Sequence, residues 1–128
     1  MRRGVQEDIL PYCRREGIGV IVYAPMASGL LTGAMTRERA ASLPPDDWRR
    51  RSTEFNEPNL SRNLALVERL RAAGKRHGRS AGEIAVAWTL RHPAVTGAIV
   101  GARTAAQAEG VMTAAELILS DRDVAVIE

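Results

Sequence analysis

The sequence has a single cysteine, few aromatic residues and no long apolar run. One cysteine, Cys13, excludes an internal disulfide framework and removes the usual reason to expect a secreted protein. No apolar stretch approaches the roughly 20 residues that a membrane-spanning helix needs. The opening stretch "MRRGVQEDIL" lacks the apolar core of a signal peptide, because Gln6, Glu7 and Asp8 interrupt it. We therefore expect a protein of the cytoplasm that makes no contact with membranes.

The charges are numerous but mixed, which weakens the case for a nucleic-acid-binding protein. The 18 Lys and Arg residues and the 15 Asp and Glu residues give a net charge of +3 and are interspersed. Basic residues are densest in "DDWRRR" (46–51), which indicates either a solvated loop with local ion pairs or a phosphate clamp. A basic helical module that binds nucleic acid through this stretch and "GKRHGR" (74–79) is the weakest alternative. Its basic residues do not gather on one face, and aromatic residues for base stacking make up only 4% of the chain.

The length of 128 residues fits one compact domain, residues 1–128, in which helices and strands alternate. The helical spacing of Val5, Ile9 and Cys13 predicts a first helix over 5–16, with Gly17 as its left-handed cap. The apolar run "IGVIVYA" (18–24) predicts a strand that is covered on both faces, as in parallel sheets. Prolines and charges predict a long loop over 34–58 with a short helix near 36–41.

The second half of the chain predicts a helical hairpin, a strand and two more helices. An apolar face at Leu60, Leu64, Val67 and Leu70 predicts a helix that ends near residue 74 or 77. "SAGE" (80–83) is a capping box that opens the next helix, which must stop before Pro93. "GAIVGA" (97–102) predicts a second strand, while "TAAQ" (104–107) and "SDRD" (120–123) each open a helix.

Two strands cannot form a complete buried sheet, because strands covered by helices need neighbouring strands at their edges. The chain therefore has the pattern of one part of a larger α/β sheet. On its own it would leave the faces of Val20, Val22, Ile99 and Val100 without neighbours. We expect such a chain to be marginally stable or prone to aggregate.

Two stretches carry a specific resemblance to a known family. "VYAPMASGLLTG" (22–33) and, further along, "AIVGARTAAQAEGV" (98–111) are similar to the C-terminal part of aldo-keto reductases, (β/α)₈-barrel enzymes that reduce carbonyl compounds with NADPH. The resemblance covers essentially the whole chain and implies a partial TIM barrel, about its last two βα units with a preceding helix. The loops after the seventh and eighth strands are where such barrels bind phosphate. The resemblance thus implies an NADP-dependent oxidoreductase with a small carbonyl substrate, completed by the N-terminal part of the barrel.

The resemblance also implies which residues contact NADP. The family's tyrosine in the first motif stacks on the nicotinamide, a role that carries over to Tyr23 and suits an aromatic face. The residues after it match positions that line the pyrophosphate, mostly through backbone N–H groups: Ala24, Pro25, Met26, Ser28, Gly29 and Leu30. Gly101 and Arg103 match positions around the adenosine ribose, and Gln107 matches the adenine side. Arg103 would favour NADPH through its 2′-phosphate, and Arg50 is our candidate for a loop arginine over the pyrophosphate. Without the motif, a core tyrosine and a plain turn are the simpler interpretations.

This chain departs from the family pattern at positions that the resemblance implies contact the cofactor. Ala34 stands where relatives often carry a lysine after the "LLTG" run. Gly110 and Val111 stand where many relatives have a Glu-Asn pair, and Glu109 is out of register by one position. These changes indicate either that other residues bind the cofactor or that this site binds the cofactor more weakly.

No residue of this chain is assigned a catalytic role, and no metal site is expected. The family's catalytic aspartate, tyrosine, lysine and histidine lie on earlier strands, and carbonyl reduction needs that tyrosine as a general acid. Tyr12 falls on a predicted helix, and His77 and His92 are at helix ends, where we expect surface residues. The chain is thus predicted to be an oxidoreductase by family but inactive alone. The alternative is a non-catalytic remnant that binds NADP(H) or a partner subunit.

Overall fold

A computed structural model of the protein describes residues 3–128. The regular elements, in chain order, are α1 (Ile9–Arg15), β1 (Val20–Tyr23), α2 (Arg37–Ala41), α3 (Asn59–His77), α4 (Ala81–Leu90), β2 (Val95–Ile99), α5 (Ala105–Met112) and α6 (Asp121–Ile127). Short 3₁₀ helices lie between them: η1 (Gly4–Gln6), η2 (Ala27–Thr32), η3 (Trp48–Arg51), η4 (Thr53–Phe55) and η5 (Thr113–Glu116). Within this described part, every helix is too short or too polar to cross a bilayer.

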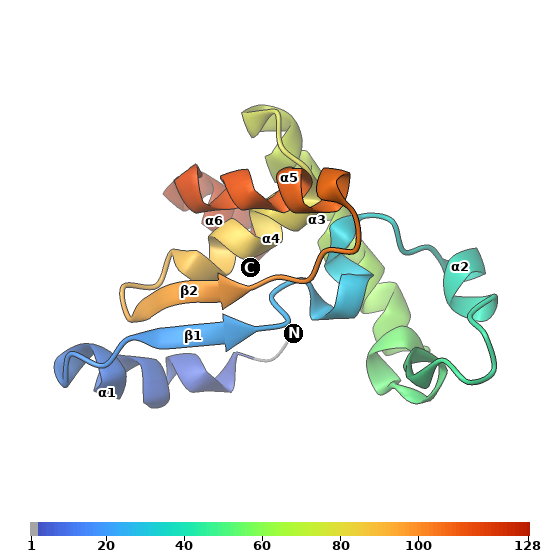
Figure 1. The fold of residues 1–128 in the computed structure, drawn as a ribbon, viewed down its shortest axis with the longest axis horizontal. Helices are drawn as coiled ribbons and strands as arrows, with labels where there is room; N and C mark the ends of the chain where they lie inside the picture. Colours follow the sequence, from blue (N-terminus) through green and yellow to red (C-terminus); the bar gives the residue numbers. More distant parts are fainter. Residues whose placement is uncertain (1–2) are drawn as a thin grey trace.

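The sheet of the described chain consists of β1 and β2, which run parallel. Tyr23 lies opposite Ile99 at the carboxyl ends, and the register shifts between Val20 and Ile21. Parallel strands need a crossover connection, which here contains α2, α3 and α4. Figure 1 shows α1 running below β1 and α4, α5 and α6 grouped above β2, while α2 and its loop extend to one side. The predicted α/β class, with two strands that are each followed by helices, is confirmed.

The helix ends follow the capping residues that the sequence predicts. Ser80 and Ser120 each accept a hydrogen bond from the backbone N–H three residues later, and the side chains of Glu83 and Asp123 return it. The capping box predicted at "SAGE" is therefore confirmed, and the helix predicted to start at "SDRD" begins with a second one. α3 ends at His77 and is capped by Gly78, whose φ of 62° is the left-handed conformation that glycine adopts without strain.

The core consists of three apolar clusters. The largest joins η2, α3, α4 and α6 and contains Leu31, Val67, Leu70, Ala73, Ala81, Ile84, Ala85 and Ile127. The second lies under the long loop and contains Leu30, Met35, Phe55 and Leu60. The third joins α1 to the turn before β2 and contains Leu10, Cys13 and Ala94. Cys13 is buried, as its helical position predicts.

Three predicted elements have other bounds in the structure, and the first of them is β1, which spans Val20–Tyr23 instead of residues 18–24. β2 begins at Val95 instead of residue 97 and ends at Ile99, because Val95 pairs with Val20 at the start of the parallel ladder. α1 begins at Ile9 instead of residue 5, because the side chain of Asp8 accepts a hydrogen bond from the Ile9 N–H and caps the helix there. The preceding residues form the short η1 instead.

The prediction of strands covered on both faces is wrong for the described residues. Ile21, Tyr23 and Ile99 are 67%, 80% and 60% exposed. Val20 and Val22, which were expected to lack neighbours, are half-buried because side chains alternate along a strand and theirs point toward the helices. One face of the sheet is thus packed and the other is open.

His77 does not lie free on the surface as predicted. Its Nε2 is 2.8 Å from Oδ2 of Asp123, a side chain that is 2% exposed. The sequence signal was misleading because the partner lies in a different helix, 46 residues away.

Candidate functional site

The candidate site forms at one edge of the sheet, where two loops leave neighbouring strands. The parallel register places Tyr23 opposite Ile99, so the segments that follow β1 and β2 begin at the same edge. These are the two segments that carry the predicted cofactor contacts. Figure 1 shows both strand arrows pointing toward this edge, with η2 after β1 and the connection to α5 after β2. In open and closed α/β sheets alike, ligands bind at the carboxyl ends of the strands.

The first loop holds its backbone in an uncommon conformation. Ala24, Ala27 and Ser28 have φ values of 52°, 48° and 55°, and Gly29 has a φ of 92°. Residues with a β-carbon adopt this left-handed region only at a cost, and such backbone strain is concentrated at binding and catalytic sites. Tyr23, directly before the loop, is 80% exposed. Its aromatic ring is therefore available to a ligand at the open face of the sheet.

Buried side chains hold the first loop in place. Leu30 is fully buried in the cluster beneath the long loop, while Leu31 is buried in the cluster with α3 and α4. The Thr32 hydroxyl donates a hydrogen bond to the Gly29 carbonyl at 2.8 Å. A β-carbon added to Gly82 of α4 would lie 3.3 Å from the Met26 sulfur, so α4 presses closely on the loop. These contacts fix the loop before any ligand binds.

The second loop presents an arginine without a charged partner. The ion pairs of residues 3–128 do not include Arg103, and its side chain lies in an exposed segment with Gly101 and Gln107. The Gln107 Oε1 atom accepts a hydrogen bond from the Arg103 backbone N–H at 2.8 Å. Thr104 caps α5 by accepting from the Gln107 N–H. The Arg103 guanidinium is thus free for an anion, while the Gln107 amide nitrogen is the part of that side chain left for a ligand.

The three arginines of the long loop differ in their availability. Arg49 donates to Asp47 through Nε at 3.0 Å and Nη2 at 2.5 Å. Hydrogen bonds from the Arg49 side chain and backbone lower the pKa of Asp47 to about 2, so the pair stays ionised and neutral overall. Arg50 is exposed, and its Nη1 donates to the Leu43 carbonyl at 3.3 Å. Arg51 is exposed as well. Because Arg49 already pairs with Asp47, the loop arginines that are available to bind a phosphate are Arg50 and Arg51.

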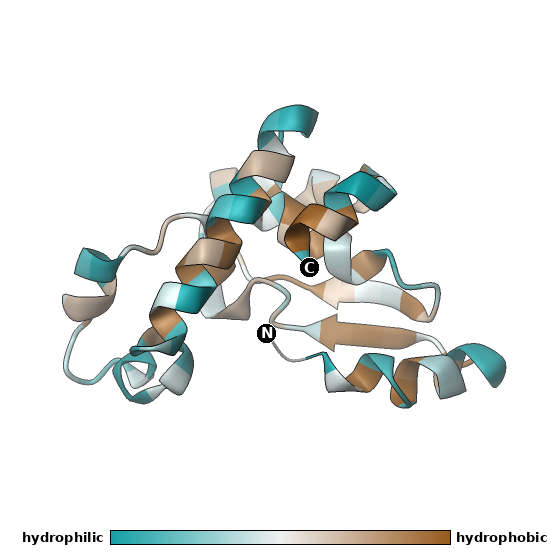
Figure 2. Ribbon diagram, turned by 180° about the vertical axis from the view of Figure 1, so that it is seen from behind, coloured by the Kyte–Doolittle hydropathy of each residue, from teal (hydrophilic) through white to brown (hydrophobic). Residues whose placement is uncertain are grey.

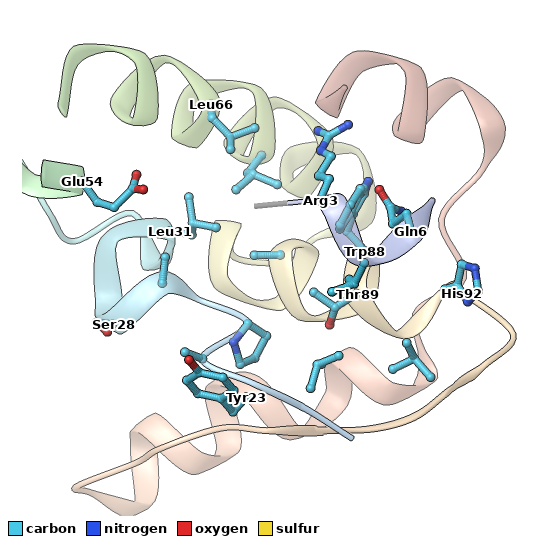
Figure 3. Close-up of a pocket in the computed structure, with 18 of the residues that line it drawn as sticks. Arg3, Gln6, Tyr23, Ser28, Leu31, Glu54, Leu66, Trp88, Thr89 and His92 are labelled. Atoms are coloured by element: carbon cyan, nitrogen blue, oxygen red, sulfur yellow. The ribbon is translucent and has the colours of Figure 1, made fainter. Parts of the chain in front are cut away.

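A cavity of about 830 Å³ lies between β1 and the helices α3 and α4. Figure 3 shows Tyr23 and Ser28 on one side of it and Trp88, with Arg3 and Gln6, on the other. The position of Trp88 beside this cavity could not be predicted from the sequence, because no local pattern reports a cavity. Within the described residues, His, Cys, Asp and Glu side chains do not gather in any group of three or more that could hold a metal ion.

Comparison with known proteins finds relatives over almost the whole chain. The sequence model of the Aldo/keto reductase family matches residues 1–128. An aldo-keto reductase of Bacillus subtilis, YhdN, is 33% identical over 122 residues, which are 94% of this chain and 36% of that protein. An NADH-specific methylglyoxal reductase of Escherichia coli is 30% identical over 121 residues, which are 94% of this chain and 36% of that protein.

Solved structures include a similar fold. The structure of a glycerol dehydrogenase from Gluconobacter oxydans matches with a TM-score of 0.88 and 32% identity, over 98% of this chain and 38% of that chain. The chain therefore spans a little over a third of the length of the relatives that it matches.

Proposed function

This chain belongs to the aldo/keto reductase family, and from that premise we propose that it is the NADPH-binding part of a barrel that reduces carbonyl compounds. The family consists of oxidoreductases that use nicotinamide cofactors. One observation carries the proposal: two loops begin at the same edge of the sheet, one with the exposed Tyr23 and the other with the unpaired Arg103. An aromatic face and a free guanidinium suit the two ends of a phosphorylated dinucleotide.

The residues present fit such a cofactor. Tyr23 would stack on the nicotinamide ring and fix which face of the ring meets the substrate. The strained loop, Ala24, Pro25, Met26, Ser28, Gly29 and Leu30, would line the pyrophosphate, because small side chains let its backbone approach closely. Arg50 would close over the pyrophosphate from the long loop. When bound, the cofactor supplies the hydride, and these side chains would bind and orient it.

Arg103 is the residue that we propose to select NADPH over NADH. Its guanidinium would bind the 2′-phosphate through paired hydrogen bonds, while Gly101 and Gln107 would border the ribose and adenine. One relative is named as NADH-specific, so cofactor choice differs among the similar proteins. The exposed, unpaired state of Arg103 supports the choice of NADPH here.

We further propose that this polypeptide is inactive without the rest of a barrel. Tyr12 is half-exposed on α1 and Tyr23 is assigned to the nicotinamide, so the 128 residues hold no tyrosine for general acid catalysis. The substrate proposed for the complete enzyme is a small carbonyl compound or its alcohol, in the cytoplasm. Catalysis would then come from residues contributed by the remaining strands.

Titration of the purified chain with NADPH and with NADH tests the proposal, with tryptophan fluorescence as the readout. We expect saturable binding that is tighter for NADPH. Arg103→Ala should weaken NADPH binding by about tenfold or more, because a charge-assisted hydrogen bond contributes about 1.5–3 kcal/mol, and should change NADH binding little. Arg14→Ala, at an exposed position of α1, is the matched control and should leave both affinities unchanged. Equal loss for both cofactors in Arg103→Ala would contradict the assignment of the 2′-phosphate.

A further inference from the structure

We propose that Thr113 is a positioning residue for the choice between NADPH and NADH, because its hydroxyl sets the orientation of α5. The opposite end of this helix follows Arg103 directly and carries Gln107 in its first turn. Thr113 itself lies outside the cofactor contacts named above, and its role rests on the proposed function, in which Arg103 binds the 2′-phosphate.

The α5 helix is attached to the molecule without burying any of its own side chains. Its residues, Ala105–Met112, are exposed or half-buried, although the helix packs against α4 (Figure 1). By contrast, α3 buries Leu60, Val67 and Leu70 along an apolar stripe, seen as brown bands along this long helix in Figure 2. Apolar burial is the usual source of helix stability in proteins. The orientation of α5 must therefore be fixed by the residues that follow it.

Thr113, the C-cap residue of α5, makes a directional contact with the start of α4. Its hydroxyl donates to Oε1 of Glu83 at 2.7 Å and accepts from Nη1 of Arg79 at 2.7 Å. Glu83 is buried in the first turn of α4, and its Oε2 accepts from the Ser80 N–H at 2.8 Å in the capping box. Ala114, which follows Thr113, is also buried. One buried methyl group and one hydroxyl between two charged groups thus fix this end of α5.

The hydrogen bonds of the Glu83 carboxylate make it a strong acceptor for the Thr113 hydroxyl. Burial raises the pKa of Glu83, but hydrogen bonds from the Ser80 N–H and the Thr113 hydroxyl outweigh burial and lower the pKa below its usual range. The group is therefore ionised at neutral pH. A hydrogen bond to an ionised group is shorter and stronger than one between neutral groups. Thr113 is thus held by a charge-assisted hydrogen bond and not by packing alone.

The N-terminal end of α5 holds the proposed cofactor contacts as one unit. The Gln107 Oε1 atom accepts from the Arg103 N–H at 2.8 Å, and Thr104 caps the helix by accepting from the Gln107 N–H at 3.2 Å. Arg103 therefore moves with the helix. Thr104 and Thr113 lie nine positions apart, which is about 13.5 Å of helix, so a tilt of about 10° at Thr113 would displace the other end by about 2 Å. Such a displacement would break a hydrogen bond to phosphate, whose length is about 2.7–3.2 Å.

Thr113→Val tests this role, because valine keeps the shape of threonine and removes the hydroxyl. Arg79 Nη1 lies 3.2 Å from Glu83 Oε1, so these two charges still pair in the variant and the chain should fold. In the fluorescence titration, the ratio of NADPH affinity to NADH affinity should fall about 3- to 10-fold, because NADH has no 2′-phosphate to lose. Thr113→Ser keeps the hydroxyl and should retain the parent ratio. Thr96→Val, which removes an exposed hydroxyl near the start of β2, is the matched control and should also retain it.

The affinity ratio distinguishes positioning from a general loss of stability. A smaller folded fraction lowers the affinity for both cofactors by the same factor and leaves their ratio unchanged. In the Arg103→Ala background, Thr113→Val should change the ratio no further, because Thr113 acts through Arg103. A parent ratio retained in Thr113→Val, or a further fall in the double variant, would overturn the role of Thr113.

Hydrogen exchange of the α5 backbone amides, measured by NMR without cofactor, is a second readout. Thr113→Val should speed exchange in α5 about threefold or more relative to α3, whereas Thr113→Ser should not. Equal exchange in the parent and Thr113→Val would overturn the orientation of α5 by this hydroxyl. A parent chain without a preference for NADPH would refute the proposed function and the role of Thr113 in cofactor choice together. A parent that prefers NADPH, beside an unaffected Thr113→Val variant, would refute the role of Thr113 alone.

Discussion

At the residue scale, the loop after β1 shows how buried anchors support a strained backbone. Ala24, Ala27 and Ser28 adopt left-handed φ values, a conformation that costs a residue with a β-carbon about 1–2 kcal/mol. The adjacent Leu30 and Leu31 are 0% and 7% exposed and lie in two different clusters. Their burial offsets the strain and keeps the loop in the shape that the proposed phosphate contacts need.

Tyr23 permits a prediction that separates binding from stability. Tyr23→Ala should weaken NADPH binding about 2- to 10-fold, because aromatic stacking contributes about 0.5–1.5 kcal/mol. The thermal midpoint should not fall, since the side chain is 80% exposed. Tyr23→Phe should bind as well as the parent, and Tyr12→Ala on α1 is the control. A Tyr23→Ala variant with unchanged affinity in the fluorescence titration would contradict the stacking role.

At the element scale, one buried carboxylate ties α6 to α3. Asp123 accepts hydrogen bonds from the Ser120 hydroxyl at 2.6 Å and from Arg76 Nε at 3.1 Å, and its Oδ2 is 2.8 Å from His77 Nε2. The Ser120 hydroxyl, with Arg76 and His77, holds the pKa of Asp123 well below its usual range. Because α6 has only seven residues, this tie and Ile127 are its main attachments.

Asp123→Asn should lower the free energy of unfolding at pH 7 by about 1–3 kcal/mol, because the variant breaks a buried network with charged groups. The pKa is depressed in the folded state, so the carboxylate stabilises the fold above about pH 4. That contribution is lost as the pH falls from about 4 toward the folded pKa. Urea unfolding curves of parent and variant should therefore converge between about pH 5 and pH 2. Asp121→Asn, exposed in the first turn of the same helix, is the control. A constant difference across this range would show that the carboxylate's charge is not responsible.

Substitution of two helical glycines by alanine should change the stability of the protein in opposite directions. A β-carbon at Gly74 of α3 would lie 2.3 Å from the Arg79 carbonyl oxygen, whereas one at Gly110 of α5 meets nothing within 4 Å. Gly74→Ala should destabilise the protein by about 1–3 kcal/mol, because backbone would have to move. Gly110→Ala should stabilise it by up to about 1 kcal/mol through helix propensity. Circular dichroism during urea unfolding measures both, and a stabilised Gly74→Ala variant would contradict the packing of α3 against the α3–α4 turn.

At the scale of the whole molecule, one open sheet face governs behaviour in solution. Ile21, Tyr23 and Ile99 gather on the face that the helices leave uncovered, and both strands have a free edge. Exposed apolar surface and unpaired strand edges are the usual causes of self-association. The chain on its own should therefore associate with itself at micromolar concentration.

The double substitution Ile21→Thr with Ile99→Thr should reduce this self-association, as sedimentation velocity would measure. Threonine keeps the β-branched shape that strands favour, so the helical circular dichroism signal should not change. Ile118→Thr is the control, because Ile118 is 90% exposed but lies in the segment before α6. Equal effects of the two changes, or a monomeric parent, would show that the open face does not drive association.

The sequence by itself determined the elements and their order. The signals that set the ends of these elements are local and extend over four to seven residues. They include the capping boxes at Ser80 and Ser120, the cap at Gly17 and the β-branched run before Tyr23. The two motifs after the strands also indicate the family to which the chain belongs. The cofactor contacts named from those motifs remain predictions that the experiments above address.

Only the tertiary structure decided which residues meet across the chain. Three features depend on residues from different elements. They are the pairing of His77 with Asp123, the packing of Leu30 and Leu31 into two separate clusters, and the position of the unpaired Trp88 indole beside a cavity. The structure also decided that Tyr23 points to the open face of the sheet and Val22 toward the helices. Periodicity and capping report on neighbours along the chain, whereas these contacts depend on how whole elements pack, so no local pattern contained them.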